Sequence, residues 1–249
     1  MSNVVELLEK LIKPKSLNLC GGGSDNFLRK EELYAALNVA VSKHAFGLNA
    51  LLMTQFSDLS ATNHVAKILL RHAEDQGISF HEIKVSIAVC TVAKIPLEVQ
   101  VKKIKSLHKR YGPRSFRSRK LITTWKKRID SLERSGGHFH LIQKHRDDIK
   151  LEEKSLDSWA MKQAKTSTIC PRCKGTGKAS SKSCSSCDGL GRFSPSMQEM
   201  KQEIISRGIS ESELGLTWYA EIINLMNIIQ IAQGEVVQEM KLRYELESI

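Results

Sequence analysis

The chain has 249 residues, enough for one large domain or two smaller domains that each bury a core. No stretch approaches the roughly 20 apolar residues of a membrane-spanning helix, which excludes a helical membrane protein and favours a soluble one. Aromatic residues make up only 6% of a basic chain with net charge +11, and five residues are proline. Because helix-forming residues are plentiful, we expect a mainly α fold.

The first third of the chain is predicted to be a series of helices. It begins with an amphipathic helix over 3–13 and a flexible, glycine-containing connection over 14–26. Gly47 is expected to break the next helical stretch, Ser60 to cap a later helix, and Cys90 to be a small buried core residue. The expected helices cover 29–43, 48–56, 60–74 and 79–93, although the β-branched content of the last leaves a strand as an alternative.

The middle of the chain carries the excess of positive charge. Residues 101–150 contain sixteen Lys or Arg and four Asp or Glu, a local net charge of +12. Helices are expected over 96–109, 116–134 and 139–165, with Gly136 and Gly137 forming the tight turn of a helical hairpin. The three nearby histidines, His138, His140 and His145, are interpreted as solvated or hydrogen-bonded side chains and not as ligands.

This basic block is typical of a polyanion-binding surface, and we expect nucleic acid as the partner. A merely solvated helix face is the alternative. Arginines alternate with Tyr111 and Phe116, and a guanidinium group suits bidentate phosphate contacts. Phe116 and Trp125 are expected to pack and not to stack on bases. The candidate nucleic-acid-binding residues of the block are Arg110, Arg114, Arg117, Arg119, Lys120, Lys126, Lys127 and Arg128.

Two matched CxxCxGxG units follow the basic block. Their cysteines, Cys170, Cys173, Cys184 and Cys187, are predicted to be the four thiolate ligands of one structural Zn²⁺ ion. Glycines such as Gly175 and Gly189 allow a positive φ, which turns backbone N–H groups toward the sulfurs. Paired disulfides or a redox dithiol are the alternatives, which an intracellular setting and the lack of a βαβ unit disfavour. Basic residues around the cysteines are further nucleic-acid candidates: Arg172, Lys174, Lys178, Lys182 and Arg192.

The C-terminal part is predicted to contain a helix over 195–206 and a longer one over 214–246. Ser210 and Glu213 have the spacing of a capping box, and the two helices suggest a helix-turn-helix-like element. The expected organisation is an N-terminal helix and flexible segment over 1–26, a helical domain over 27–112, a basic helical insertion over 113–165, a four-cysteine zinc finger over 166–194 and a C-terminal helical region over 195–249 that completes the core.

Several of these stretches resemble the Q transcription antitermination proteins of lambdoid phages, of the type that carries a zinc finger. Residues 32–47 are similar to the family's early helix with its Ala-Phe-Gly turn, and Leu59-Ser-Ala-Thr-Asn63 falls where its next helix begins. The unit Cys170–Gly191, the following Arg192-Phe-Ser-Pro195 and the region around Thr217-Trp218 match as well. The basic block over about 100–155 looks like an insertion relative to the best-known member.

The resemblance implies a non-enzymatic regulator of phage late genes in the host bacterial cytoplasm. Such a protein binds double-stranded promoter DNA, engages paused RNA polymerase with its primary sigma factor, and lets the polymerase read through terminators. A DnaJ-like zinc-binding folding helper is an alternative, although the chain has two CxxCxGxG units where that family has four, and no His-Pro pair. Another DNA-binding regulator unrelated to antitermination, or a recombinase-type enzyme, are further alternatives.

Overall fold

The computed structural model describes residues 30–136 and 138–247, with side chains described for 42–136, 138–240 and 242. The expected helix over 3–13, the connection over 14–26, Cys20 and Gly137 lie outside these ranges. The described chain is mainly helical, as its composition predicts. It divides into two compact units, unit 1 (Met1–Ala93 with Leu214–Ile249) and unit 2 (Lys94–Glu213).

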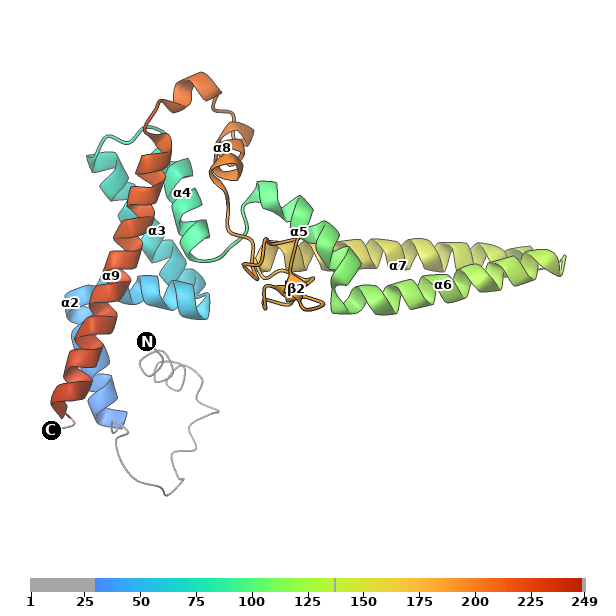
Figure 1. Cartoon of the computed structure of the whole chain (residues 1–249), viewed down its shortest axis with the longest axis horizontal. Coiled ribbons are helices and arrows are strands. Elements are labelled where there is room, and N and C mark those ends of the chain that lie inside the picture. The colour runs from blue at the N-terminus through green and yellow to red at the C-terminus, as the bar shows by residue number, and fades with distance from the viewer. Residues whose placement is uncertain (1–29, 137, 248–249) are drawn as a thin grey trace. The chain divides into compact units, whose positions relative to one another are not determined.

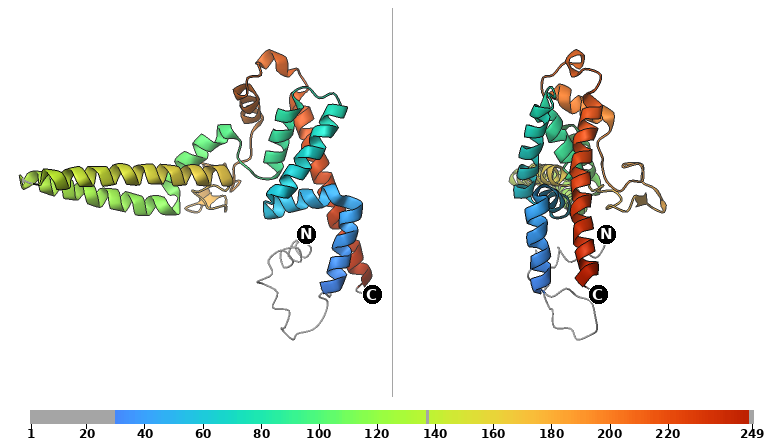
Figure 2. Two further views of the ribbon diagram at one scale, coloured as in Figure 1. Left: turned by 180° about the vertical axis from the view of Figure 1, so that it is seen from behind. Right: turned by 90° about the vertical axis from the view of Figure 1, so that its left-hand side faces the viewer.

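Unit 1, within the described ranges, is a bundle of four helices. They are α2 (Lys30–Phe56), α3 (Leu59–Asp75), α4 (His81–Val92) and α9 (Trp218–Glu247). The last of these returns from the far end of the sequence and packs along both α2 and α4 (Figures 1 and 2). Three of its buried side chains, Ile222, Leu225 and Ile229, are fully shielded from solvent. Residues His81–Val92 form the helix α4, which excludes the alternative of a strand near 79–93.

Two expected details of unit 1 are wrong for physical reasons. The expected break after residue 43 is present as a kink of α2 at His44 (φ −131°, ψ 43°), but Gly47 lies inside the helix and does not cause it. A Cβ at Gly47 would lie 2.2 Å from the carbonyl oxygen of Ala232, so the glycine permits close packing of α2 on α9. The cap of α3 is Asp58 and not Ser60, because the Asp58 carboxylate accepts a hydrogen bond from the Ala61 N–H at 2.9 Å.

A buried lysine of unit 1 is paired with a partly exposed glutamate. The side chain of Lys84 on α4 is 1% exposed, and its Nζ donates to the Glu221 carboxylate of α9 at 2.5 Å and to Ser79 Oγ at 3.3 Å. A buried ammonium group is costly unless it is paired and hydrogen-bonded. The pair therefore ties α4 and α9 together by charge as well as by apolar packing.

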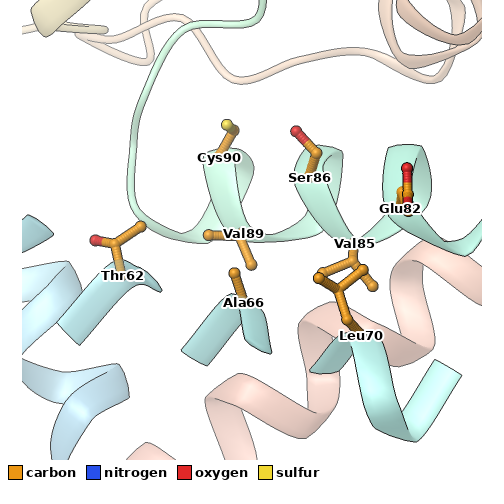
Figure 3. A pocket seen from close by; sticks show the side chains of 8 residues that line it. All are labelled: Thr62, Ala66, Leu70, Glu82, Val85, Ser86, Val89 and Cys90. Atoms are coloured by element: carbon orange, nitrogen blue, oxygen red, sulfur yellow. The ribbon is translucent and has the colours of Figure 1, made fainter. Parts of the chain in front are cut away.

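A hollow of about 400 Å³ lies between α3 and α4 and is shown in Figure 3. It is lined by Thr62, Ala66, Leu70, Glu82, Val85, Ser86, Val89 and Cys90. Cys90 is half-buried at this hollow, so the expectation of a buried core thiol is corrected. The reason is its helical position: Val89 and Val92 face the core, and Cys90 is turned away from them by the 100° step between successive helical residues.

Unit 2 contains a helical hairpin, a cysteine-rich segment and a short helix. The elements are α5 (Glu98–Tyr111), α6 (Pro113–Arg134), α7 (Phe139–Thr166), β1 (Lys178–Ala179), β2 (Lys182–Ser183), α8 (Met197–Ser206) and the 3₁₀ helix η2 (Glu211–Leu214). Helices α6 and α7 run side by side as the predicted antiparallel hairpin, and α5 packs against α7 (Figures 1 and 2). The two-stranded sheet of β1 and β2 is antiparallel, with Lys178 opposite Ser183.

The hairpin has the spacing of a short coiled coil. Apart from Arg114, the buried or half-buried positions of α6 follow one another in steps of three and four residues: Ser115, Ser118, Ile122, Trp125, Ile129 and Leu132. Polar pairs accompany this seam, because Ser118 Oγ donates to Glu152 Oε1 at 2.5 Å and an Arg114 guanidinium nitrogen donates to Ser155 Oγ at 2.7 Å. Half-buried Trp125 packs as expected, whereas Phe116, 71% exposed, points away from the seam, which contradicts its expected packing role.

Helix α8 is held on the first turn of α5 by carboxylates. Ser196 and Glu199 form a capping box that starts α8. Fully buried Glu203 accepts a hydrogen bond from the Val99 N–H at 3.2 Å, and Glu199 accepts one from the Gln100 side chain at 3.2 Å. Negative charge at a helix N-terminus is favourable because the N–H groups there lack intrahelical acceptors.

The helix-turn-helix-like element is not shown. Helix α8 belongs to unit 2 and packs on α5, whereas α9 belongs to unit 1. The predicted helix over 214–246 begins later, at Trp218, because Ser210 and Glu213 cap only the 3₁₀ turn η2 and Gly215 has φ +68°. The predicted domain boundary at residue 112 falls between α5 and α6, which both belong to unit 2. Among the described helices, none has the length and apolarity to cross a membrane.

Candidate metal centre and basic surface

The four cysteines of the repeated motif come together in one buried cluster. Their Sγ atoms all lie within 4.8 Å of one another. The Cys170–Cys184 and Cys173–Cys187 sulfur distances are 3.9 and 3.6 Å. These separations exceed a disulfide bond of about 2.05 Å and match the roughly 3.8 Å edge of a tetrahedron with metal–sulfur bonds of about 2.3 Å. The donor set and its spacing therefore fit a four-coordinate metal ion.

The cluster is also part of the hydrophobic core of unit 2. Each cysteine is at most 5% exposed, and the four pack with Val101, Ile104, Ala164 and Phe193. Helices α5 and α7 thus supply the apolar wall behind the sulfurs. A metal ion held by all four cysteines would have no coordination position left for water or substrate, which is the arrangement of structural zinc sites.

Burial and hydrogen bonding set the charge of the thiols. Burial raises the pKa of Cys187 to about 12 and also raises the pKa of Cys170. Burial acts in the same direction on Cys184, but hydrogen bonds from the Ser186 backbone and the other thiols outweigh it and lower that pKa to about 7. Without a cation, the cluster therefore keeps several protons, and a bound dication must displace them.

The second glycine of each repeat is required by a close backbone approach that sequence reasoning missed. A Cβ at Gly177 would lie 2.1 Å from the Gly189 carbonyl oxygen, and one at Gly191 would lie 2.2 Å from the Gly175 carbonyl oxygen. The two halves of the motif therefore pack backbone against backbone. The signal was present in the sequence, because both units keep this glycine at the same offset.

Gly191→Ala is expected to destabilise the cluster far more than Gly175→Ala. Both glycines have a positive φ, +77° and +88°, so both substitutions carry the cost of about 1 kcal/mol for a left-handed non-glycine residue. Only Gly191 adds a backbone clash, since the nearest atom to a Cβ at Gly175 is 3.6 Å away. Thermal unfolding of the metal-loaded protein measures the difference, and equal melting temperatures would contradict the backbone packing.

One candidate of the basic block and one candidate near the cysteines both contact the ring of Tyr111. The guanidinium carbons of Arg110 and Arg172 lie 5.3 and 5.6 Å from the centre of the Tyr111 ring. Arg172 also donates to Ser185 Oγ at 2.8 Å. Cation–π contacts of this kind hold the cysteine-rich segment against the junction of α5 and α6.

Apart from Arg110 and Arg172, the candidate cations fall into two groups. Arg114 and Arg119 are committed to intramolecular contacts, the former with Ser155 and Glu152, the latter with the carbonyl oxygens of Arg110 and Ser115. The other group is exposed and makes no side-chain hydrogen bond or ion pair within the described residues. On α6 it comprises Arg117, Lys120, Lys126, Lys127 and Arg128, and near the cysteines it comprises Lys174, Lys178, Lys182 and Arg192.

The histidines of the hairpin do not form a metal site. His138 and His140 are exposed and contact each other edge to face, with ring centroids 6.4 Å apart. His145 Nδ1 lies 3.5 Å from Asp148. Within the described part of the chain, the four cysteines are the only group of three or more His, Cys, Asp or Glu side chains placed to hold a metal ion.

Comparison with known families places the whole chain in one group. The sequence matches the model of the family Conserved hypothetical protein CHP02642 over residues 2–248. The chain belongs to this family. No curated protein and no solved structure matches the sequence. The matched residues include both the basic hairpin and the cysteine cluster, so the family model covers both features.

Proposed function

We propose that this chain is a zinc-containing, DNA-binding transcription regulator that acts as an antiterminator of the Q type. The observation that carries DNA binding is the set of five exposed α6 cations that make no ion pair within the described residues. Cations without protein partners are available for phosphates, and their contacts release counterions from the duplex. The antitermination step, with RNA polymerase and its primary sigma factor as partners, rests on the resemblance of the cysteine unit and the early helix to that family.

Zinc is the metal that best suits the cluster. Four thiolates favour zinc over magnesium or calcium, which prefer oxygen ligands, and the buried site leaves no coordination position open. In this proposal Cys170, Cys173, Cys184 and Cys187 hold one structural Zn²⁺ ion. The ion would fix the cysteine-rich segment against α5 and α7, so that its lysines and arginines keep a defined position relative to α6. The protein itself carries out no catalysis in this proposal.

The double variant Lys120→Ala/Lys127→Ala is expected to bind duplex DNA at least tenfold more weakly at low salt. Both lysines lie on the solvent-facing side of α6, and removal of each phosphate-binding cation should reduce the slope of log affinity against log salt by about 0.9. Lys67→Ala/Arg71→Ala removes two exposed cations from α3 and is the charge-matched control. Fluorescence anisotropy across a salt series measures both. Equal weakening by the two double variants would assign the effect to net charge and contradict a defined surface.

Transcription in vitro through a terminator tests the regulatory step. The full-length protein, polymerase and primary sigma factor are combined on a template with or without the upstream promoter DNA. Readthrough that requires the upstream DNA is expected. Suppression of protein aggregation without readthrough would favour the folding-helper alternative, and strand cleavage would favour an enzyme.

A further inference from the structure

We infer that Phe116 forms a stacking platform for an unpaired base of a single-stranded nucleic acid that runs along α6. This inference rests on the proposed function and adds, to the duplex contacts of the α6 cations, a contact of Phe116 with an unpaired base. The side chain of Phe116 is 71% exposed, although it belongs to a helix whose seam has room for apolar side chains such as Ile122 and Ile129. An aromatic ring left in solvent contributes nothing to the packing of the hairpin.

The surroundings of Phe116 are those of a nucleic-acid-binding surface. With the seam of α6 on one side, the 100° step per residue places Phe116, Lys120 and Lys127 on the opposite side. Residues three and four apart are neighbours on a helix, so the ring lies beside the Lys120 side chain. Thr123 and Thr124 continue the same face with hydroxyl groups. The acidic residues of α6, Asp130 and Glu133, come only in its last turns.

The Phe116 ring can stack on a base of a single strand but not on a base of an intact duplex. Bases in a duplex are stacked on each other and expose only their edges, so a phenyl ring on a helix face finds no base plane to cover. An unpaired base presents its π-face, and proteins bind single strands by combining aromatic platforms with a row of cations along the backbone. On this face of α6, Phe116 is followed by Lys120 about one helical turn away and by Lys127 about two turns further, and each turn rises about 5.4 Å. The ligand chemistry is therefore an unpaired nucleobase with flanking phosphates, in DNA or RNA.

The test compares Phe116→Ala with Phe139→Ala in the full-length, metal-loaded protein. Phe139 is 76% exposed and begins α7, just after the hairpin turn. It is therefore a similarly exposed ring near the far end of α6, which lies about 27 Å along that helix from Phe116. Binding is measured by fluorescence anisotropy to a labelled single-stranded DNA, a single-stranded RNA and a duplex of the same sequence. Phe116→Ala is expected to weaken binding to at least one single strand about tenfold or more and to leave duplex affinity within about twofold. Phe139→Ala should change none of the three.

A third variant guards against an indirect effect of the substitution. Phe116→Trp should keep single-strand affinity, and its emission, measured as the difference from the parent protein, should be quenched when a base stacks on the indole. Equal binding of Phe116→Ala and the parent protein to both single strands would overturn the inference, as would an equal reduction for single strand and duplex. Duplex binding without any single-strand binding would overturn this inference alone. Absence of binding to all three probes would overturn the proposed function as well.

Discussion

Removal of the metal ion is expected to unfold the cysteine cluster and the adjoining parts of α5 and α7. The four sulfurs are core residues of unit 2, and without a cation they would be close, partly charged neighbours in an apolar setting. Structural zinc sites contribute about 10–16 kcal/mol of apparent binding free energy, as much as the whole stability of a typical domain. Metal analysis should give one zinc ion per chain, and strong chelation should abolish the hydrogen-exchange protection of amides around Ile104 and Ala164.

Single substitutions separate this effect from general damage by the chelator. Cys173→Ser should lose the metal and reproduce the exchange pattern of the chelated protein. Cys90→Ser, which changes a thiol on α4 outside the cluster, should keep the metal content of the parent protein. Cobalt substitution offers a direct signature, since a tetrathiolate site gives intense charge-transfer absorption. A chelated protein that keeps full protection near Ile104 would contradict a structural metal.

Glu221→Gln is expected to lower the free energy of unfolding by about 3 kcal/mol. The substitution leaves the Lys84 ammonium group buried and without its counter-charge. Glu211→Gln is a suitable control, because it breaks the pair with Lys201 at the surface and should cost less than about 1 kcal/mol. The double variant Lys84→Met/Glu221→Gln should recover most of the stability, since it removes the buried charge. Urea unfolding measures all of these changes, and a decrease under about 1 kcal/mol for Glu221→Gln would contradict the role of the pair.

The same pair predicts a pH dependence of stability. Burial acts to raise the pKa of Glu221, but the hydrogen bonds from Lys84 and Thr217 outweigh it and lower the pKa below its ordinary value. A carboxyl with a lowered folded-state pKa stabilises the protein above the ordinary glutamate value of about 4.3, and this stabilisation disappears as the pH falls further. The difference in unfolding free energy between the parent protein and Glu221→Gln should therefore be greatest near neutral pH and shrink below about pH 4.

The local elements of the fold followed closely from local signals. The predicted helices over 96–109, 116–134, 139–165 and 195–206 correspond to α5, α6, α7 and α8, because the residues that start and stop a helix act on the backbone of their own turn. The grouping of the four cysteines was predictable for a similar reason, since each CxxC unit aims two sulfurs at one point by its own turn geometry. Gly47 was misinterpreted because the reason for it lies far along the chain, at Ala232.

The sequence alone determined the helical character of this protein, its four-cysteine cluster and the concentration of positive charge near the middle of the chain. All three depend on residue type and short spacing, which act within one or two turns. The tertiary structure alone decided that α9 joins α2 and α4, that Lys84 is buried against Glu221, which cations are committed within the protein, and that Phe116 faces solvent. These outcomes depend on which helix faces meet, and that choice is made by the summed packing of distant segments, which no single stretch of sequence encodes.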